Sequence, residues 1–371
     1  MSGGGQVRMR RRLRLLGRDE RGAVGVLVGL LLGTVLLGLG ALVIDVGQLY
    51  QERSQLQSGA DAAATAVAKS CVLGTCTNSS ATTTAVTYAG ENASDSTAGV
   101  PLVCGSGALG TCSATTGVMT DCPAAPAAGI NYVDVHTATA TSGGGTAVAP
   151  VFARALLGNG SYNGTQVLAC SQAQWGGPTA ATTIAFAISA CEWDTATSQG
   201  TVFAQPPPAV PPASYDQVLT VHTGGSGTGC ASEPAGSDAP GNFGWTDDPT
   251  GTCQVSVSGG TFSGDPGASA SNVCKDVLAM AQASRSVVYI AIYTKITGTG
   301  AGSVYTLKGF AAFVVTGYHL PGASASDWLN PANDCSGSNK CINGYFTQGI
   351  IPSGSSPGGA YLGAAVIRIT G

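Results

Sequence analysis

The stretch GAVGVLVGLLLGTVLLGLGALVI, residues 22–44, decides the fold of this 371-residue chain. It holds twenty-three consecutive uncharged residues and is rich in Leu and Val. At about 1.5 Å per residue, a helix of this length crosses a hydrocarbon core of about 30 Å. A buried core helix is the alternative, but apolar runs of this length are rare in soluble domains. We therefore predict a transmembrane helix over residues 22–44.

The flanking charges predict how this helix is oriented. Only Arg53 follows it closely, whereas seven Arg precede it: Arg8, Arg10, Arg11, Arg12, Arg14, Arg18 and Arg21. Basic residues stay on the cytoplasmic side, so we expect a cytoplasmic Arg-rich segment over residues 1–21 and an extracytoplasmic C-terminal domain. A cleaved signal peptide, including a twin-arginine one, is the competing interpretation. It is disfavoured because the apolar run exceeds the about 7 to 15 residues of such signals and ends without a compact Ala-x-Ala site.

Three glycines recur every fourth residue of the apolar run: Gly25, Gly29 and Gly33. This spacing lines one face of a helix, where a second backbone can approach closely. The sequence therefore predicts lateral helix packing there. The alternative is that membrane helices are simply rich in glycine.

Residues 45–71 continue the helical pattern in amphipathic form. Val46, Leu49, Leu56, Ala60 and Val67 keep a three-to-four spacing, and polar residues occupy the other side. We predict a helical stalk that ends near residues 71–74 and packs on the domain outside the membrane.

The motifs of this segment resemble a known family. Arg18-Asp-Glu-Arg-Gly-Ala-Val-Gly-Val precedes the apolar run, Ile44-Asp-Val-Gly-Gln-Leu-Tyr50 follows it, and then comes Leu56-Gln-Ser-Gly-Ala-Asp-Ala-Ala-Ala64. Together they resemble the N-terminal segment of TadE/TadG-like proteins of Flp (tight adherence) pilus assembly. The residues that carry this resemblance are Asp45, Gly47, Tyr50, Leu56, Gln57, Ala60 and Asp61. Residues 143–154 and 173–178 also resemble the outer domains of such proteins in high-GC Gram-positive bacteria.

The resemblance implies a membrane-anchored accessory or pilin-like component, with other pilus-assembly components and itself as partners. Pilin-like members cut by a prepilin peptidase carry a Glu shortly after the cleavage point. Cleavage after Gly17 or Gly22 would place Gly22 or Leu27 there, so the unprocessed, TadG-like kind is expected.

All twelve cysteines follow the apolar run: Cys71, Cys76, Cys104, Cys112, Cys122, Cys170, Cys191, Cys230, Cys253, Cys274, Cys335 and Cys341. An even set confined to the translocated side indicates disulfides in an oxidising compartment. The local pairs 71–76, 104–112, 170–191, 230–253 and 335–341 are natural, but twelve cysteines allow on the order of ten thousand connectivities.

The remaining chain is poor in charge and rich in small residues. Only 10% of the residues are charged and 55 are Gly, which predicts short strands and long loops. Residues 46–371 carry nine Lys or Arg against seventeen Asp or Glu. This acidic balance has no basic patch for phosphates, so no nucleic-acid partner is expected.

Local patterns predict a few elements outside the membrane. Residues 72–128 suggest loops and short strands, residues 132–141 a strand, and residues 150–157 a short helix. Residues 272–285 suggest a helix, residues 286–297 and 303–318 a hairpin, and residues 360–370 a closing strand. The fold class is α+β: a transmembrane helix that continues as an amphipathic helix, then a β-rich, disulfide-supported, loop-rich ectodomain. We divide the ectodomain into residues 72–204, a Pro-rich linker over 205–213, and residues 214–371.

No motif for catalysis, a cofactor or a metal stands out. The chain has no phosphate loop with Lys, no His-Glu-x-x-His and no Cys-x-x-Cys. We therefore expect no catalytic, cofactor-binding or metal-binding residues and no enzymatic activity. A structural component of a Flp/Tad-type pilus or related surface apparatus is the leading hypothesis. A surface adhesive module unrelated to a pilus and an anchored extracellular hydrolase are the alternatives.

Overall fold

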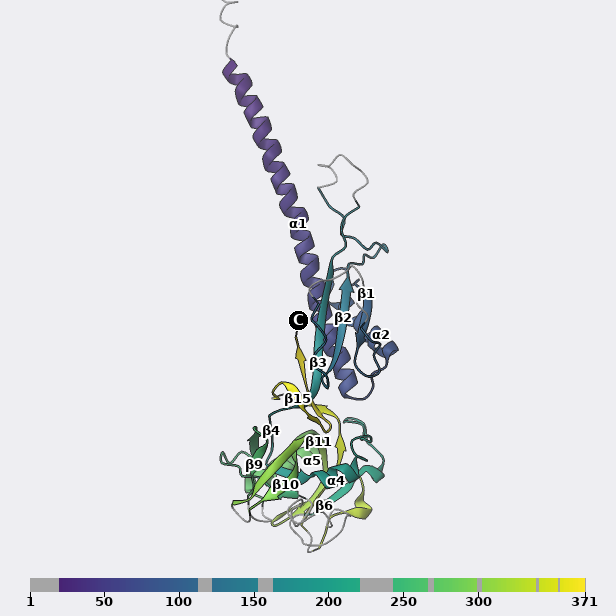
Figure 1. Ribbon diagram of the computed structural model, residues 1–371, viewed down its shortest axis with the longest axis vertical. Coiled ribbons are helices and arrows are strands. Elements are labelled where there is room, and N and C mark those ends of the chain that lie inside the picture. Colours follow the sequence, from purple (N-terminus) through teal and green to yellow (C-terminus); the bar gives the residue numbers. More distant parts are fainter. Residues whose placement is uncertain are drawn as a thin grey trace, which may run out of the picture.

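The fold consists of a long helix, a small sheet packed on its far half, and a larger β-rich unit beyond it (Figure 1). The computed structural model describes residues 20–112, 122–152, 163–220, 243–265, 270–298, 302–337, 340–352 and 354–370. It is of mixed α and β composition with several disulfides, which confirms the predicted fold class. The predicted helix over 150–157 lies mostly outside the described residues.

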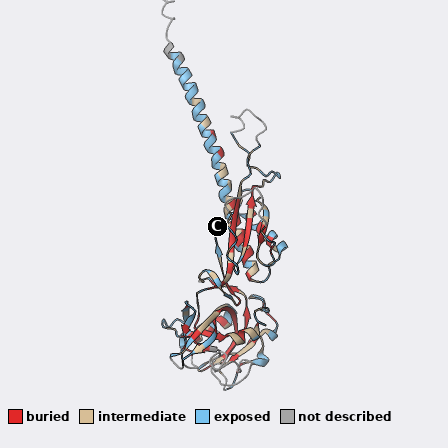
Figure 2. Ribbon diagram, in the orientation of Figure 1, coloured by how far each residue is buried: buried red, intermediate tan, exposed pale blue. Residues whose placement is uncertain are grey.

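Helix α1 runs without interruption from Glu20 to Val72, over 53 residues. Uncharged Leu and Val continue into the Ala-rich amphipathic part with no Pro to break the backbone. Its N-terminal half extends from the molecule and is exposed, whereas its C-terminal half packs on the small sheet (Figure 2). One helix therefore combines the predicted membrane segment and the predicted stalk.

Helix α2, Asn78–Glu91, corrects the prediction of loops and short strands over residues 72–128. Its start carries a capping box: Thr77 accepts a hydrogen bond from the Ser80 backbone N–H, and Ser80 accepts one from the Thr77 N–H. Its buried face consists of Ala81, Ala85 and Ala89, four residues apart. The capping box and the alanine face are short patterns of small residues, so they are weak signals in the sequence.

The small sheet is antiparallel and covers α1 and α2. Its strands lie in the order β1, β2, β3, β16, with bounds Gly99–Gly105, Asn131–Ala138, Leu168–Pro178 and Ala364–Ile369. Alanines of both helices meet Val, Trp and Ala side chains of the sheet in one core: Ala63, Ala64, Val67, Ala68, Val72, Ala81, Ala85, Val103, Leu109, Val133, Val135, Ala173, Trp175 and Ala365. Small side chains on both helices allow this close approach to the sheet.

The larger unit is organised around the predicted hairpin. Strands β10, Val287–Thr297, and β11, Val304–Leu320, pair antiparallel, which confirms the hairpin. The other strands of this unit are β5 Phe186–Ser189, β6 Gln217–Thr220, β7 Phe243–Trp245, β9 Thr261–Ser263, β12 Ala323–Ala325 and β13 Cys341–Thr347. Two more, β4 Ala181–Ile184 and β8 Gln254–Val257, form a separate pair.

Short helices cover this unit. They are α4 Ala190–Ala196, α5 Asn272–Ser284 and the 3-10 turns Ala213–Tyr215 and Pro331–Asn333. Helix α5 confirms the helix predicted over residues 272–285, and it buries Cys274, Leu278 and Ala281. The main core lies between these helices and the sheet and includes Phe186, Ile290, Phe313 and Ile342.

The end of the chain connects the two parts. Strand β15, Pro357–Tyr361, pairs with β3 of the small sheet and with β11 of the larger unit. Strand β14, Gly349–Ile350, pairs with β16, which returns beside β3. Strand β3, which precedes residues 205–213, therefore pairs with β15 and β16, which follow them, in one continuous sheet.

Disulfides connect neighbours in space that are not always neighbours in sequence. The structure contains Cys71–Cys76, Cys104–Cys112 and Cys335–Cys341, three of the local pairs suggested above. The pairs 170–191 and 230–253 are wrong, because Cys170 bonds to Cys122 and Cys253 bonds to Cys274. Cys191 is also disulfide-bonded, and Cys230 lies outside the described residues.

Candidate functional site: the junction of α1 with the folded domain

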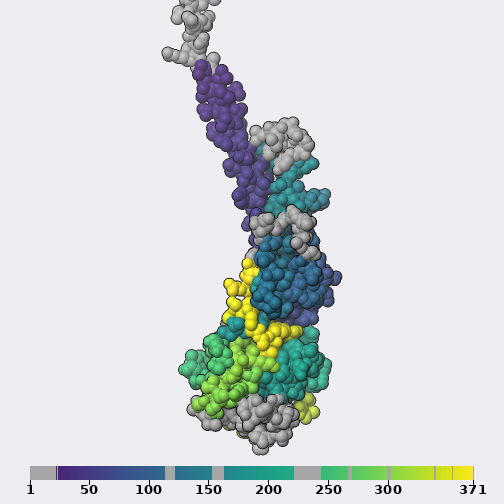
Figure 3. Space-filling model, viewed as in Figure 1, coloured from purple at the N-terminus to yellow at the C-terminus, as the bar shows by residue number. Residues whose placement is uncertain are grey.

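The apolar half of α1 presents its side chains to the surroundings. Leu37 is 76% exposed, and most Leu and Val residues between positions 24 and 44 are exposed as well. Among the described residues, α1 is the one helix long and apolar enough to cross a membrane. In the space-filling view this half projects as a bare rod (Figure 3). Such a surface is unfavourable in water, because apolar area is costly to hydrate.

The three spaced glycines lie on this bare rod. A Cβ added at Gly25, Gly29 or Gly33 would meet no atom within 4 Å. The structure thus leaves their face open, and packing of a second helix there stays a prediction.

Asp45 is the first charged residue after the apolar run, and the fold covers it. Its side chain is 9% exposed. The carboxylate accepts hydrogen bonds from the backbone N–H of Val151, at 2.8 Å, and of Phe152, at 3.1 and 3.2 Å. The segment after β2 is thereby bound to the helix where its apolar half ends. The two motifs resembling the family, one near Asp45 and one at residues 143–154, meet here, which no local pattern indicates.

The other motif residues divide between the outer and the inner face of α1. Gly47 has no atom within 4 Å of an added Cβ, and Tyr50 is exposed. Leu56 and Ala60 are buried against the sheet and α2. The Leu56 carbonyl also accepts a hydrogen bond from Thr137 Oγ1 of β2 at 2.9 Å.

Gln57 links the motif to the sheet. Its Nε2 donates to the Cys170 carbonyl of β3 and to Asp61 Oδ1 one turn later, both at 3.0 Å. The amide thus satisfies a strand carbonyl and orients the carboxylate. Asp45, Leu56 and Gln57 therefore hold α1 against the fold.

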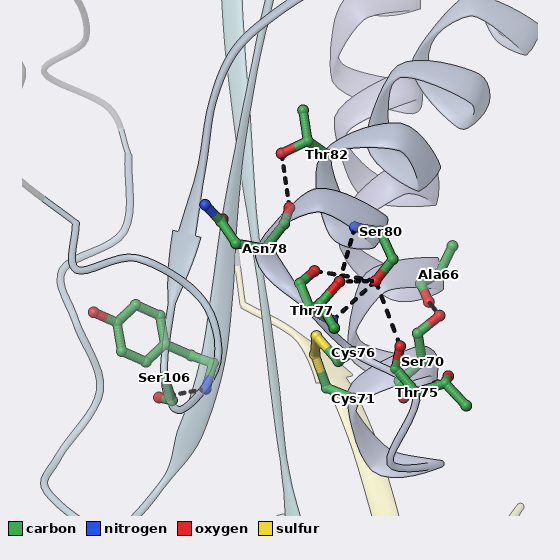
Figure 4. The surroundings of a disulfide bond; sticks show 11 residues. Ala66, Ser70, Cys71, Thr75, Cys76, Thr77, Asn78, Ser80, Thr82 and Ser106 are labelled. Atoms are coloured by element: carbon green, nitrogen blue, oxygen red, sulfur yellow. Dashed lines mark hydrogen bonds between the residues drawn. A yellow bond between two sulfur atoms is a disulfide. The ribbon is translucent and has the colours of Figure 1, made fainter.

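The far end of α1 is closed by a compact turn (Figure 4). The Cys71–Cys76 disulfide links the last turn of α1 to the residues before α2, next to the Thr77 and Ser80 cap. From β15, the strand that connects the two parts, Tyr361 Oη donates to the Val72 carbonyl at 2.9 Å. Burial raises the pKa of Tyr361 to about 12, so this donor keeps its proton. The helix end is therefore fixed both by this turn and by β15.

A buried polar cluster braces the larger unit. Thr316 Oγ1 donates to Asp216 at 2.7 Å, and Asn343 Nδ2 donates to Asp327 at 3.0 Å and to Asp216 at 3.4 Å. Burial, together with the neighbouring Asp327 carboxyl, raises the pKa of Asp216 to about 8. All four side chains are buried. These hydrogen bonds join the residue before β6 to β11 and β13, and they join β13 to the loop that precedes it.

A second polar group lies on the small sheet. Asp134 and His136 of β2 neighbour Cys104 and Cys170 across the strands. Burial raises the pKa of Asp134 and lowers that of His136. Within the described ranges, Cys104, Cys112 and Asp134 form the one group with metal-binding geometry. Its two sulfur atoms are joined in a disulfide, which removes the thiolates that a metal would require.

An open hollow of about 770 Å³ lies beside α4 in the larger unit. Lys308 binds Asp194 there at 3.0 Å and lies 5.0 Å from the Trp193 ring centroid. The two charged residues that line the hollow, Asp194 and Lys308, therefore form an ion pair with each other.

Comparison with known proteins agrees with the motif geometry. Residues 22–70 match the family model described as "Putative Flp pilus-assembly TadE/G-like". No curated protein and no solved structure matches the chain. The match begins in the apolar run and ends at the last turns of α1, and so spans Asp45, Gln57 and the Ala-rich face. Residues 22–70 are thus similar to TadE/G-like Flp pilus-assembly proteins, as the motifs indicated.

Proposed function

We propose that the chain is a membrane-anchored structural or accessory component of a Flp/Tad-type pilus or related surface apparatus. The observation that carries this proposal is the continuity of α1. One helix has an exposed apolar half long enough to cross a membrane and a second half that forms part of a folded core. A helix of this kind suits a role in holding a domain at a membrane surface.

The proposed orientation has the N-terminus in the cytoplasm and the folded domain outside. Two observations support it. The Arg residues precede the apolar run, and the disulfides lie beyond it, where an oxidising exterior allows them to persist.

The proposed partners are the cytoplasmic membrane, further copies of the chain and other pilus-assembly components. The open face at Gly25, Gly29 and Gly33 supports lateral contact between helices in the membrane. The proposed units are a cytoplasmic segment 1–21, a membrane helix 22–44, a stalk 45–71, ectodomain parts 72–204 and 214–371, and a Pro-rich linker 205–213. The contacts of Asp45 and Gln57 support a structural role rather than catalysis.

The experiment compares cells that contain the full chain with cells in which its gene is deleted. We expect deletion to reduce surface filaments seen by electron microscopy and the full chain to restore them. The intact chain should remain in alkaline-washed membranes while sheared filaments are removed. A matched control replaces Leu30 and Leu37 by Lys, which should release the chain from membranes because charges in the span are costly.

Unchanged filaments after deletion would contradict the pilus role and favour a separate surface-binding function. A chain that leaves with the sheared filaments, shortened at its N-terminus, would instead indicate a processed, pilin-like component.

A further inference from the structure

The segment bonded to Asp45 lies at the level where the apolar half of α1 ends. Asp45 directly follows the charge-free run, and its carboxylate binds the backbone N–H groups of Val151 and Phe152. Ala41, one turn earlier on the same helix face, is also covered, with 9% exposure. The covering of the helix thus extends four residues, or about 6 Å, into the apolar run.

The side chains of this segment are exposed although they are apolar. Val151 is 53% exposed and Phe152 is 40% exposed. No charged residue occurs over residues 139–152, which lead from β2 to this point. In Figure 1 the connection between β2 and β3 rises beyond the sheet along α1, toward its apolar half. An uncharged segment with an exposed aromatic side chain can enter a lipid interface without desolvating a charge.

The role of Asp45 fits such a position. Backbone N–H groups that leave water need an acceptor within the protein, because an unsatisfied donor in lipid is costly. Asp45 supplies that acceptor to two consecutive N–H groups, and these groups in turn stabilise its charge at the membrane boundary.

We propose that Val151 and Phe152 form a second membrane contact, inserting at the boundary between headgroups and acyl chains beside α1. This inference rests on the proposed anchoring of α1. The bilayer is the occupant that the geometry favours, because these exposed apolar side chains lie at the level where the exposed apolar surface of the helix ends. The ectodomain is then held to the membrane at two points, which restricts its tilt around α1.

The test measures tryptophan fluorescence of the full chain in phosphatidylcholine vesicles whose acyl chains carry bromine, a short-range quencher. Phe152→Trp reports the proposed contact, and Leu37→Trp, in the middle of the apolar run, reports the anchor. Met280→Trp is the matched control, because Met280 is 63% exposed on α5 of the larger unit. The unchanged chain gives the background from its own four residues: Trp175, Trp193, Trp245 and Trp328.

We expect brominated lipid to quench Phe152→Trp and Leu37→Trp beyond the background and to leave Met280→Trp unchanged. Quenching of Leu37→Trp without quenching of Phe152→Trp would overturn the second contact and leave the anchor intact. The fluorescence of Phe152→Trp can also be compared between lipid discs that hold one copy of the chain and discs that hold several. An unquenched signal that differs between these discs would assign this surface to a second chain, which also overturns the proposal. Absence of quenching at Leu37→Trp would refute the anchor itself and the inference with it.

Discussion

The carboxylate of Asp45 and the backbone N–H of Val151 are 2.8 Å apart although 106 residues separate them in sequence. This bond connects the end of the apolar part of α1 to a residue in the middle of the β2–β3 connection. It marks the place where the proposed membrane segment passes into the folded domain.

Replacing Asp45 by Ala should free the segment at residues 151–152 without unfolding the ectodomain. Two N–H groups lose a charged acceptor, which costs about 1 to 3 kcal/mol locally. Hydrogen exchange of the Val151 and Phe152 amides should become faster, whereas that of β10 should not change. Glu91→Ala, at an exposed carboxylate that ends α2, is the matched control. Equal exchange rates in Asp45→Ala and the unchanged chain would show that the bond does not hold the segment.

Glycines of α1 should differ in their tolerance of a larger side chain. A Cβ at Gly59 would lie 3.2 Å from the Ala89 backbone of α2, whereas a Cβ at Gly47 would meet nothing within 4 Å. Gly59→Leu should therefore destabilise the domain by about 1 to 3 kcal/mol through overpacking. Gly47→Leu should leave it unchanged or slightly more stable, since glycine weakens a helix. Thermal unfolding in detergent measures both, and equal midpoints would contradict the close packing of α1 on α2.

The stability of the larger unit should fall as the pH rises from about 4 to about 8. Burial raises the pKa of Asp216 to about 8. The folded chain therefore keeps a proton that the unfolded chain has released above the ordinary pKa of a carboxyl group. The contribution of this group is complete at low pH and is lost as pH passes through the folded pKa, with a slope of at most about 1.4 kcal/mol per pH unit.

Asp216→Asn should flatten this slope, because an amide does not titrate and its oxygen can still accept the hydrogen bond from Thr316. Asp248→Asn is the control. Desolvation raises the Asp248 pKa, but hydrogen bonds from Cys253, Thr250 and Thr252 together lower it, so the contribution of Asp248 to stability changes only at acidic pH. Denaturant unfolding at several pH values measures the slopes. A slope in Asp216→Asn as steep as in the unchanged chain would assign the pH dependence to other groups.

Two disulfides should differ in how much they stabilise the domain. Cys122–Cys170 joins residues 48 apart, whereas Cys71–Cys76 joins residues only 5 apart. Closing the longer loop removes more entropy from the unfolded chain, about 4 kcal/mol against about 2 kcal/mol. Paired Ser substitutions at each bridge, compared by denaturant unfolding, test this order. Peptide mapping without reduction tests the pairing itself, and a fragment that links Cys170 to Cys191 would refute it.

Much of the architecture could be predicted from local patterns. The charge-free run and its amphipathic continuation predicted α1, which ends at Val72 within the expected turn. Alternating apolar residues around a Gly-rich connection predicted the β10–β11 hairpin. Such elements repeat a short period along the chain, so a window of ten to twenty residues is enough to recognise them. Helix α2 was missed because its buried face is only alanine, which contributes little apolar contrast.

By itself, the sequence determined that one end of this chain is a long apolar helix, that its motifs are TadE/G-like, and that the cysteines follow the helix. Only the tertiary structure decided that Asp45 binds Val151, that Cys122 bonds to Cys170, and that β16 returns beside β3. The physical reason is the separation in sequence between the residues that interact. Helix periodicity and hydropathy are properties of neighbouring residues, whereas these contacts depend on how distant segments close on one another. That closure follows from the packing of the whole core, which no short stretch of sequence contains.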